Sequence, residues 1–296
     1  MAMRVIVFDV QHGFCAFVKS PTGHTLLIDC GRGELFSPVE YILAHELKDT
    51  VSYDGFPLTQ LIVSHPHDDH IEDIHRVTTK LQPAILYRQR YDWDEVKQPD
   101  VATDEYENLD HYAQWQRTYN APVVNPPDWG IDIQTFRLTP DEAKEVDEAK
   151  FINNSSIVVV VTFKGTRFSE KFVFGGDVEE GAWTALLERQ SFKDAVAGAD
   201  FFVDPHHGHS SGFSAAVLDA MGRPILNIIS AHSRDESVDS RYSKEEYALG
   251  TTFNGEKRRM LSTRKDGSIF IDVTEEGKFL IRTFHLIPNL ELTTVY

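Results

Sequence analysis

The chain has 296 residues, of which 41% are hydrophobic and 11% aromatic, so it can bury a large core and does not have the composition of a disordered protein. Its formal net charge of −17 argues against a broad basic surface for nucleic acid, although bound metal ions would still supply local positive charge for a phosphodiester. No apolar run is long enough to span a membrane, the N-terminus lacks a signal-peptide cleavage site, and two cysteines make no disulfide framework. We therefore expect a cytoplasmic protein with free thiols and no membrane partner.

The predicted elements begin with short strands and continue as alternating strands and helices. Strand-forming residues between turn signals predict strands at 4–9, 15–19, 24–29, 61–64, 84–87, 131–138, 156–163, 171–174, 200–203, 224–230, 268–273 and 279–286. Apolar residues at helical spacing predict helices at 37–47, 71–81, 179–188 and 213–221, and the charged stretch 140–149 is a turn or a short helix. Ser37 is the expected cap of the first helix and Pro38 its first residue. This order favours α+β or α/β layers in a single domain over residues 1–296, because no repeat or linker divides the chain.

Residues 88–128 interrupt the strand pattern with a polar tract rich in tyrosine and tryptophan, helix-like around 104–117. We predict an insertion or cap there. Its aromatic rings either contact the substrate or bury one another in a small helical layer, and the sequence leaves both interpretations open.

The most unusual stretch is LIVSHPHDDHIEDI, residues 61–74, in which an apolar run leads directly into His65, His67, Asp69 and His70. Burying imidazoles and carboxylates without partners is unfavourable, so packing does not explain their density. Imidazole and carboxylate groups are good ligands for zinc, manganese and iron ions. The stretch therefore predicts a metal site, and a polar loop rich in histidine is the alternative.

Two more apolar strands end in residues of the same kind. Asp177 follows the strand that ends in FGG, and His206 and His207 follow the strand that precedes DPHHGHS. Ligand sites in layered sheets gather at strand ends, so we expect these residues to meet the first cluster. The donors exceed one four-coordinate site, which indicates two ions roughly 3.5–4 Å apart that activate water. The reaction class is hydrolysis of an ester, phosphodiester, amide or lactone.

HPHDDH resembles the H-x-H-x-D-H signature of the metallo-β-lactamase superfamily. More closely, the chain is similar to the hydrolase domain at the C-terminus of ComEC-type DNA-uptake proteins and to its stand-alone relatives. The matching stretches follow the family's order over nearly the whole chain: FDVQHGFCAFVKSPTGHTLLIDCG, SHPHDDHIEDI, NNSSIVVVVTFKGTRF, FVFGGDVEEGA, ADFFVDPHHGHSSGF, PILNIIS and, more weakly, RKDGSIFI. The resemblance implies an αββα sandwich of the α+β class, with two mixed β-sheets flanked by helices and the metals at one edge.

The resemblance also implies roles for the clustered residues. His65 and His67 would bind one ion, Asp69 and His70 would bind the other, and Asp177 would bridge the two. Asp69 would in addition orient the attacking hydroxide. Two divalent ions are the implied cofactors, with zinc as the first choice and manganese or iron as alternatives.

The HHGH loop supplies the remaining candidates. The resemblance gives the second ion a histidine from this loop, either His206 or His207; we assign His206 as the ligand and His207 as the acid for the leaving group. His209 is another candidate acid. Ser210 is a candidate for substrate binding, and a plain turn is the alternative.

Two further residues are candidates. Asn153 stands near the position that often supplies a third histidine to the first ion, where ComEC-type domains also carry asparagine; it would be a weak ligand, a water-positioning residue or a strand cap. Residues 11–14 read QHGF where ComEC-type domains carry an acid, so His12 would line the site or serve in a turn.

The sequence therefore predicts a metal-dependent hydrolase, and phosphodiesterase or nuclease activity is the first choice because the nearest look-alikes are regarded as such. The substrate would be a small-molecule or nucleic-acid phosphodiester. One alternative is a carboxylic ester, lactone or thioester hydrolase. An alternative of another class is a non-catalytic module that binds a metal or a nucleotide. Fold resemblance alone does not decide among these chemistries.

Overall fold

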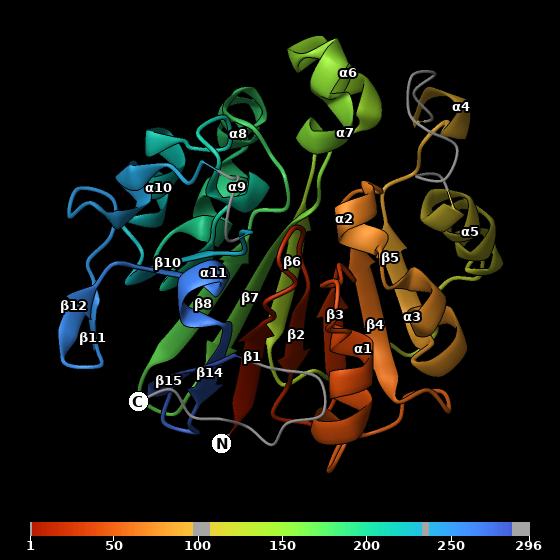
Figure 1. Cartoon of the computed structure of the whole chain (residues 1–296), viewed down its shortest axis with the longest axis horizontal. Helices are drawn as coiled ribbons and strands as arrows, with labels where there is room; N and C mark the ends of the chain where they lie inside the picture. Colours follow the sequence, from red (N-terminus) through yellow and green to blue (C-terminus); the bar gives the residue numbers. More distant parts are fainter. Residues whose placement is uncertain (1, 97–106, 233–236, 286–296) are drawn as a thin grey trace.

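Two β-sheets pack face to face and helices cover the outer face of each, which makes an αββα sandwich (Figure 1). The structure is a computed structural model, and it describes residues 2–96, 107–232 and 237–285. Both sheets mix parallel and antiparallel pairs, which confirms the fold expected from the sequence. Within those ranges, no helix is long and apolar enough to cross a membrane.

The first sheet has the strand order β15-β14-β1-β2-β3-β4-β5. Its strands are β1 (Met3–Val7), β2 (Ala16–Lys19), β3 (Thr25–Ile28), β4 (Leu58–Val63), β5 (Pro83–Arg88), β14 (Ser268–Val273) and β15 (Phe279–Phe284). Strand β4 pairs in parallel with β3 and β5 and is buried on both faces, because Leu61 and Val63 face the helices while Ile62 faces the second sheet. A central parallel strand of this kind is expected to read as a continuous apolar run.

The second sheet has the strand order β13-β10-β9-β8-β7-β6. Its strands are β6 (Asp132–Phe136), β7 (Val158–Lys164), β8 (Ser169–Phe174), β9 (Phe201–Val203), β10 (Leu226–Ile229) and β13 (Met260–Ser262). Strands β8, β9, β10 and β13 run in parallel, so their carboxyl ends meet at one edge. A separate hairpin contains β11 (Thr251–Phe253) and β12 (Glu256–Arg258).

The helices are short, and several end in a 3-10 or π turn. They are α1 (Pro38–Tyr41), η1 (Ile42–Glu46), α2 (Asp68–Ile71), α3 (Ile74–Lys80), α4 (Trp93–Val96), α5 (Glu107–Trp115), η3 (Gln116–Thr118), α6 (Pro140–Val146), η4 (Glu148–Lys150), α7 (Phe151–Asn154), α8 (Glu180–Leu187), α9 (Gln190–Val196), η5 (His206–Gly208), α10 (Ala215–Met221), η6 (Ser240–Ser243) and α11 (Thr263–Asp266). Helices α1, α3 and α5 cover the first sheet, and α8, α9 and α10 cover the second (Figure 1).

The core between the sheets consists of side chains from alternate positions of the facing strands. Phe172 and Phe201 stack there at a ring-centroid distance of 4.6 Å, and Val5 and Val161 are fully buried in the same cluster. Each fully buried side chain of this kind stabilises the fold by about 1.5–3 kcal/mol. This rigid core fixes the strand ends that carry the polar loops.

Most predicted elements are present, and the differences lie in helices and late strands. Ser37 accepts a hydrogen bond from the amide of Glu40, and Pro38 begins α1, which confirms the predicted cap. The predicted helix at 71–81 is two helices, α2 and α3, and α2 already begins at Asp68. Helix α9, the hairpin β11–β12 and strand β13 were not predicted, because their segments lack a long apolar period.

The tract 88–128 joins the two sheets, and residues 97–106 of it lie outside the described residues. Helix α5 packs on α2 and α3 and buries Tyr112. The rings of Trp93 and Tyr112 meet edge to face at 5.8 Å, and the Tyr91 hydroxyl lies 2.9 Å from Oγ of Ser155. These aromatic side chains thus pack on one another and on the core. The division into one domain with a cap stays a prediction.

Glu170 is a charged side chain on the inner face of β8, the face that carries Phe172 and Phe174. It is 6% exposed, and its Oε2 has no hydrogen-bond partner among the described residues. Burial, together with the nearby charge of Asp200, raises the pKa of Glu170 to about 8. The folded protein therefore holds this proton at a pH where the unfolded chain has released it.

We expect Glu170→Gln to change how stability depends on pH. Because the pKa of Glu170 is raised in the folded state, the folded protein binds this proton more tightly than the unfolded chain does. The stability that this proton contributes is complete below the unfolded-state pKa and is lost as the pH rises toward 8. The variant lacks this loss, so its melting temperature should exceed that of the wild type by several degrees at pH 9 and by much less at pH 5. Thermal unfolding at both pH values measures this. Glu256→Gln, on exposed β12, is the control, and an equal gain for Glu170→Gln at the two pH values would contradict the expectation.

Candidate metal centre

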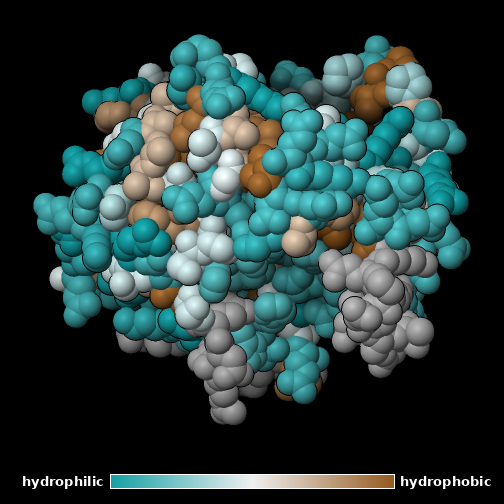
Figure 2. Space-filling view, turned by 90° about the horizontal axis from the view of Figure 1, so that it is seen from above, coloured by the Kyte–Doolittle hydropathy of each residue, from teal (hydrophilic) through white to brown (hydrophobic). Residues whose placement is uncertain are grey.

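The polar loops of the chain gather at one edge of the sandwich, where the carboxyl ends of β3, β4, β8, β9 and β10 meet (Figure 1). Loops leaving β4, β8 and β9 carry His65, Asp177 and His207. Figure 2 looks down on the molecule from above and shows a largely hydrophilic surface with a few apolar side chains near its middle. The prediction that the three strand ends converge agrees with this placement.

Six side chains at this edge form two groups of metal-type donors. Within each group the potential ligand atoms all lie within 4.8 Å of one another. The first group is His65, His67 and Asp177, and the second is Asp69, His70 and His207. Both groups join residues that are distant in sequence, which only the strand topology brings together.

Asp177 lies between the two groups. Its Oδ2 is 3.6 Å from Nε2 of His65 and 3.7 Å from Nε2 of His207. Its Oδ1 is 3.1 Å from Nε2 of His70. A carboxylate in this position can contact an ion in either group, which is the geometry that a bridging ligand needs.

The donor atoms fit divalent metal ions better than they fit one another. His70 Nε2 and Asp177 Oδ1 are buried and close together, yet neither forms a hydrogen bond of acceptable geometry among the described residues. Buried polar atoms of this kind require an explanation, and a bound ion supplies one. Imidazole nitrogens and carboxylate oxygens in groups of three are also the donor set of zinc-type sites.

The charges of these side chains shift one another's pKa values. Burial opposes the charge of His70, but Asp177, Asp69 and Asp29 raise its pKa well above the ordinary value. Burial likewise opposes the charge of His207, and Asp177 and Asp69 raise its pKa to about 9. Burial opposes ionisation of Asp177 as well, but His70 and His207 hold its pKa well below the ordinary value. In the metal-free protein the protonated imidazoles and the ionised carboxylates of the cluster therefore balance one another, and bound ions would take the place of those protons.

Asp29 supports the second group from behind and was not recognised in the sequence. Its Oδ2 accepts hydrogen bonds from Nδ1 of His70 at 2.8 Å and from Oγ of Ser64 at 2.6 Å, and its Oδ1 accepts from the amide of Ser64 at 2.6 Å. This fixes the His70 tautomer, so that Nε2 faces the other donors. The available signal was an aspartate that directly follows a buried strand, much as Asp177 follows β8 after two glycines.

Two glycines allow neighbouring loops to contact the helix that carries Asp69. A Cβ atom on Gly13 would lie 2.1 Å from the carbonyl oxygen of Asp69, and one on Gly31 would lie 2.4 Å from it. The amide of Phe14 donates to that same oxygen at 3.1 Å. Side chains at these two positions would therefore push α2 out of place.

The HHGH loop turns His207 inward and His206 outward. His207, which is 8% exposed, places Nε2 3.0 Å from Oδ2 of Asp69, and its Nδ1 lies 3.2 Å from the carbonyl oxygen of Ser230. His206 instead places Nδ1 2.9 Å from Oγ of Ser211. The structure thus brings His207, not His206, into the second group, the reverse of the positions expected from the sequence.

The turn that places His207 is strained. His206, His207 and Gly208 have φ angles of 50°, 54° and 74°, all in the left-handed region. Non-glycine residues there cost about 1–3 kcal/mol each and persist only where surrounding contacts hold them. The amide of His206 donates to the carbonyl of Gly176 at 2.9 Å, and the amide of Asp239 donates to the carbonyl of Gly208 at 2.8 Å.

The other candidates lie around the donor groups. Asn153 is half-buried, and its Oδ1 is buried without a hydrogen-bond partner among the described residues. The His12 side chain is 62% exposed, with Nε2 3.6 Å from Oδ2 of Asp69. His209 and Ser210 are exposed, and Nδ1 of His209 lies 3.0 Å from Oγ of Ser211. Of these four residues, His12 is the one whose side chain lies close to a donor residue, Asp69.

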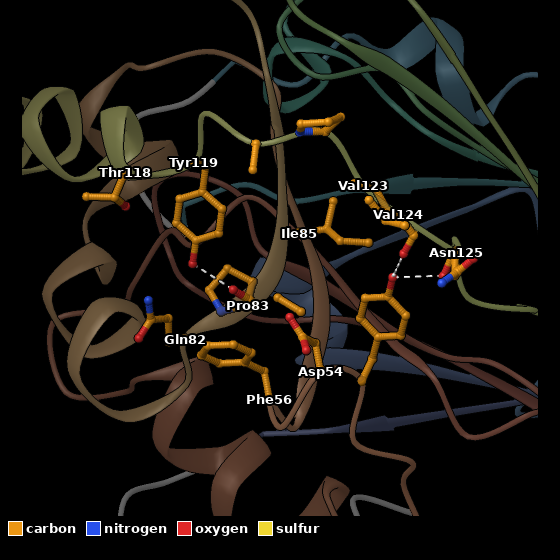
Figure 3. Close-up of a pocket in the computed structure, with 14 residues that line it drawn as sticks. Asp54, Phe56, Gln82, Pro83, Ile85, Thr118, Tyr119, Val123, Val124 and Asn125 are labelled. Atoms are coloured by element: carbon orange, nitrogen blue, oxygen red, sulfur yellow. Dashed lines mark hydrogen bonds between the residues drawn. The ribbon is translucent and has the colours of Figure 1, made fainter.

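A separate pocket of ≈ 690 Å³ opens at the other end of the first sheet, beside Pro83 at the start of β5 (Figure 3). The Tyr53 hydroxyl donates to the carbonyls of Val124 and Asn125 at 3.2 and 2.9 Å, and the Tyr119 hydroxyl donates to the carbonyl of Pro83 at 2.6 Å. Its lining includes no member of either donor group, so it does not belong to the candidate centre.

We expect Asp29→Asn to weaken metal binding while the fold is retained. An amide cannot accept from Ser64 and His70 as a carboxylate does, and loss of a carboxylate behind a metal-binding histidine lowers metal affinity by about 10–100-fold. Zinc affinity of the metal-free protein, measured by calorimetry, tests this. Asp272→Asn, which alters a carboxylate paired with Arg4 far from the centre, is the control. Unchanged zinc affinity in a folded Asp29→Asn variant would show that Asp29 does not support metal binding by His70.

Comparison with known proteins places this fold and centre in a wider context. The family model described as the metallo-β-lactamase superfamily matches residues 9–232, and no curated protein matches the chain. Similar solved structures include an isothiocyanate hydrolase from Delia radicum gut bacteria, 12% identical, which covers 94% of this chain and 99% of its own with a TM-score of 0.47. Unliganded yeast PDE1 is 13% identical; the match covers 84% of this chain and 92% of PDE1, with a TM-score of 0.45. A long form RNase Z from yeast is also 13% identical; the match covers 87% of this chain and 41% of RNase Z, with a TM-score of 0.42. The family match spans most of the chain and includes every residue of the two donor groups, so the chain belongs to the metallo-β-lactamase superfamily.

Proposed function

We propose that this chain is a metal-dependent hydrolase of phosphodiesters that uses two divalent ions, with zinc as the first choice. The observation that carries the proposal is the pair of donor groups with Asp177 between them at one edge of the sandwich. The ordered motifs shared with ComEC-type hydrolase domains support a phosphodiester as the substrate. His12 lies beside His207, and His209 and Ser211 contact the neighbouring His206, and this polar rim suits an anionic substrate better than an apolar one.

The chain's own residues would hold and orient the ions. His65 and His67 would hold the first ion, Asp69, His70 and His207 the second, and Asp177 would contact both. Two divalent ions, when bound, lower the pKa of water and stabilise the negative charge that develops on the scissile group. Asp29 and the carbonyl of Ser230 occupy Nδ1 of His70 and His207, so each imidazole presents Nε2 to the centre.

His12 is the side chain best placed to protonate the leaving group. His207 belongs to a donor group, so it is not free for the acid role that the sequence suggested. The His12 ring lies 5.3 Å from the His207 ring, and the His12 side chain is largely exposed to solvent. A histidine there can carry a proton in from solvent, as general acids do.

Metal-dependent turnover of bis-p-nitrophenyl phosphate is the expected activity, measured beside a p-nitrophenyl ester and a lactone. Chelation should abolish it, and Zn²⁺ or Mn²⁺ should restore it. His67→Ala and Asp177→Ala each remove a donor and should lower kcat by about 10²-fold or more, in line with the loss of a group that stabilises transition-state charge. Asp272→Asn should keep wild-type turnover. Faster cleavage of the ester or lactone would show that phosphodiesters are not the preferred substrate class. A fully active His67→Ala or Asp177→Ala variant would show that the metal site is assigned wrongly.

The loss of activity in His12→Ala should depend on how strongly the leaving group needs a proton. p-Nitrophenolate leaves as a stable anion and needs little protonation, whereas the alkoxide from a dinucleotide needs a proton. We therefore expect His12→Ala to slow dinucleotide cleavage by about 10²-fold and bis-p-nitrophenyl phosphate cleavage by much less, since general acids contribute on that scale. His209→Ala, which alters another exposed histidine of the rim, serves as the comparison. An equal loss of kcat on both substrates would assign His12 to binding instead.

A further inference from the structure

Asp204 is a buried acid directly behind the metal centre that neither the donor groups nor the proposed chemistry uses. It follows β9 immediately, is 5% exposed and precedes the HHGH loop. Neither of its carboxylate oxygens has a hydrogen-bond partner among the described residues. An apolar residue would suit this position better for folding, because burying an unpartnered carboxyl group is unfavourable. Departures of this kind from local folding rules are expected where function requires them.

A small cavity connects Asp204 to the donor groups. Asp177, Asp204, His207 and Ser230 all line it, and it leaves ≈ 10 Å³ of room for the centre of a water molecule. That is about the space that one water needs, and a buried water also needs polar partners. Asp204 supplies two unpartnered oxygens, and Asp177 lines the same cavity with lone pairs beyond those that an ion would use, because a carboxylate has about four acceptor sites. One water has the two protons that two carboxylates can accept.

Tyr242 is another buried polar side chain that the proposed chemistry does not use. Its hydroxyl is buried and has no hydrogen-bond partner among the described residues. Burial and the charge of Asp204 both raise the pKa of Tyr242 well above the ordinary value. Tyr242 lies on η6, just after Asp239, whose amide holds the carbonyl of Gly208 in the strained turn.

We propose that Asp204 is a positioning residue that binds one internal water in this cavity and, with Tyr242, holds the His206–Gly208 turn so that His207 faces Asp69 and Asp177. The water joins Asp204 to Asp177 across the cavity that both line. Asp204 thus acts through His207 and Asp177 and touches neither substrate nor ion. This inference rests on the proposed function, because its purpose is the geometry of the second donor group.

Zinc titration of the metal-free protein by calorimetry and thermal unfolding of that same protein test the inference together. Asp204→Leu removes the polar group, so it should raise the melting temperature of the metal-free protein and weaken one of the two zinc-binding steps by about 10–100-fold. Asp204→Asn keeps hydrogen bonding to water and should stay within a few-fold of wild-type affinity. Tyr242→Phe removes one hydroxyl and should weaken the same step by a smaller factor than Asp204→Leu does.

Glu170→Gln is the matched control, since Glu170 is another buried acid with an unpartnered oxygen but lies at the start of β8, away from the centre. It should raise stability at high pH and leave zinc affinity unchanged. Normal zinc affinity in Asp204→Leu, or a lower melting temperature of its metal-free form, would overturn the inference and leave the proposed function standing. Asp204→Asn binding as weakly as Asp204→Leu would also overturn it. A wild-type protein that binds no zinc would overturn the proposed function and the inference with it.

Discussion

The hydrogen bond between Asp29 and His70 anchors the charge balance of the whole centre. His70 is fully buried and lies among three carboxylates, those of Asp29, Asp69 and Asp177, at 2.8, 3.7 and 3.1 Å. Those carboxylates could not remain ionised in the interior without the imidazoles. The loops that carry these groups are consequently restricted to positions in which acid and base stay in contact.

This constraint explains why unfavourable local features collect at one edge of the sandwich. Asp29 itself has a left-handed φ of 56°, and His206 and His207 adopt the same conformation. Asp204 is a buried acid without a partner among the described residues. None of these features helps the chain to fold, and each lies within a few residues of a strand end at the centre. The inner faces of both sheets, by contrast, are packed with apolar side chains, and their stability offsets the strain at the edge.

The sequence predicted those parts that depend on local patterns. Apolar strands such as β4 and the cap at Ser37 have local causes, so the fold class and the main strands could be predicted. The donor residues could also be named, because each follows an apolar strand. The choice between His206 and His207 could not be made, since it depends on backbone angles in one turn and on contacts with Ser230 and Ser211. Asp29 was missed because its role comes from a hydrogen bond across 41 residues of chain.

The two donor groups are unequal, and this inequality is built into the chain. The second group has three residues of its own, Asp69, His70 and His207, whereas the first has His65 and His67 and depends on Asp177 for its third donor. Asp177 is also close to His70 and His207 of the second group, so an ion there would share this carboxylate with the first group. Oδ1 of Asn153, which has no hydrogen-bond partner among the described residues, is neutral and would add no charge. The first group would therefore hold its ion with less negative charge than the second, because the second group also contains the carboxylate of Asp69.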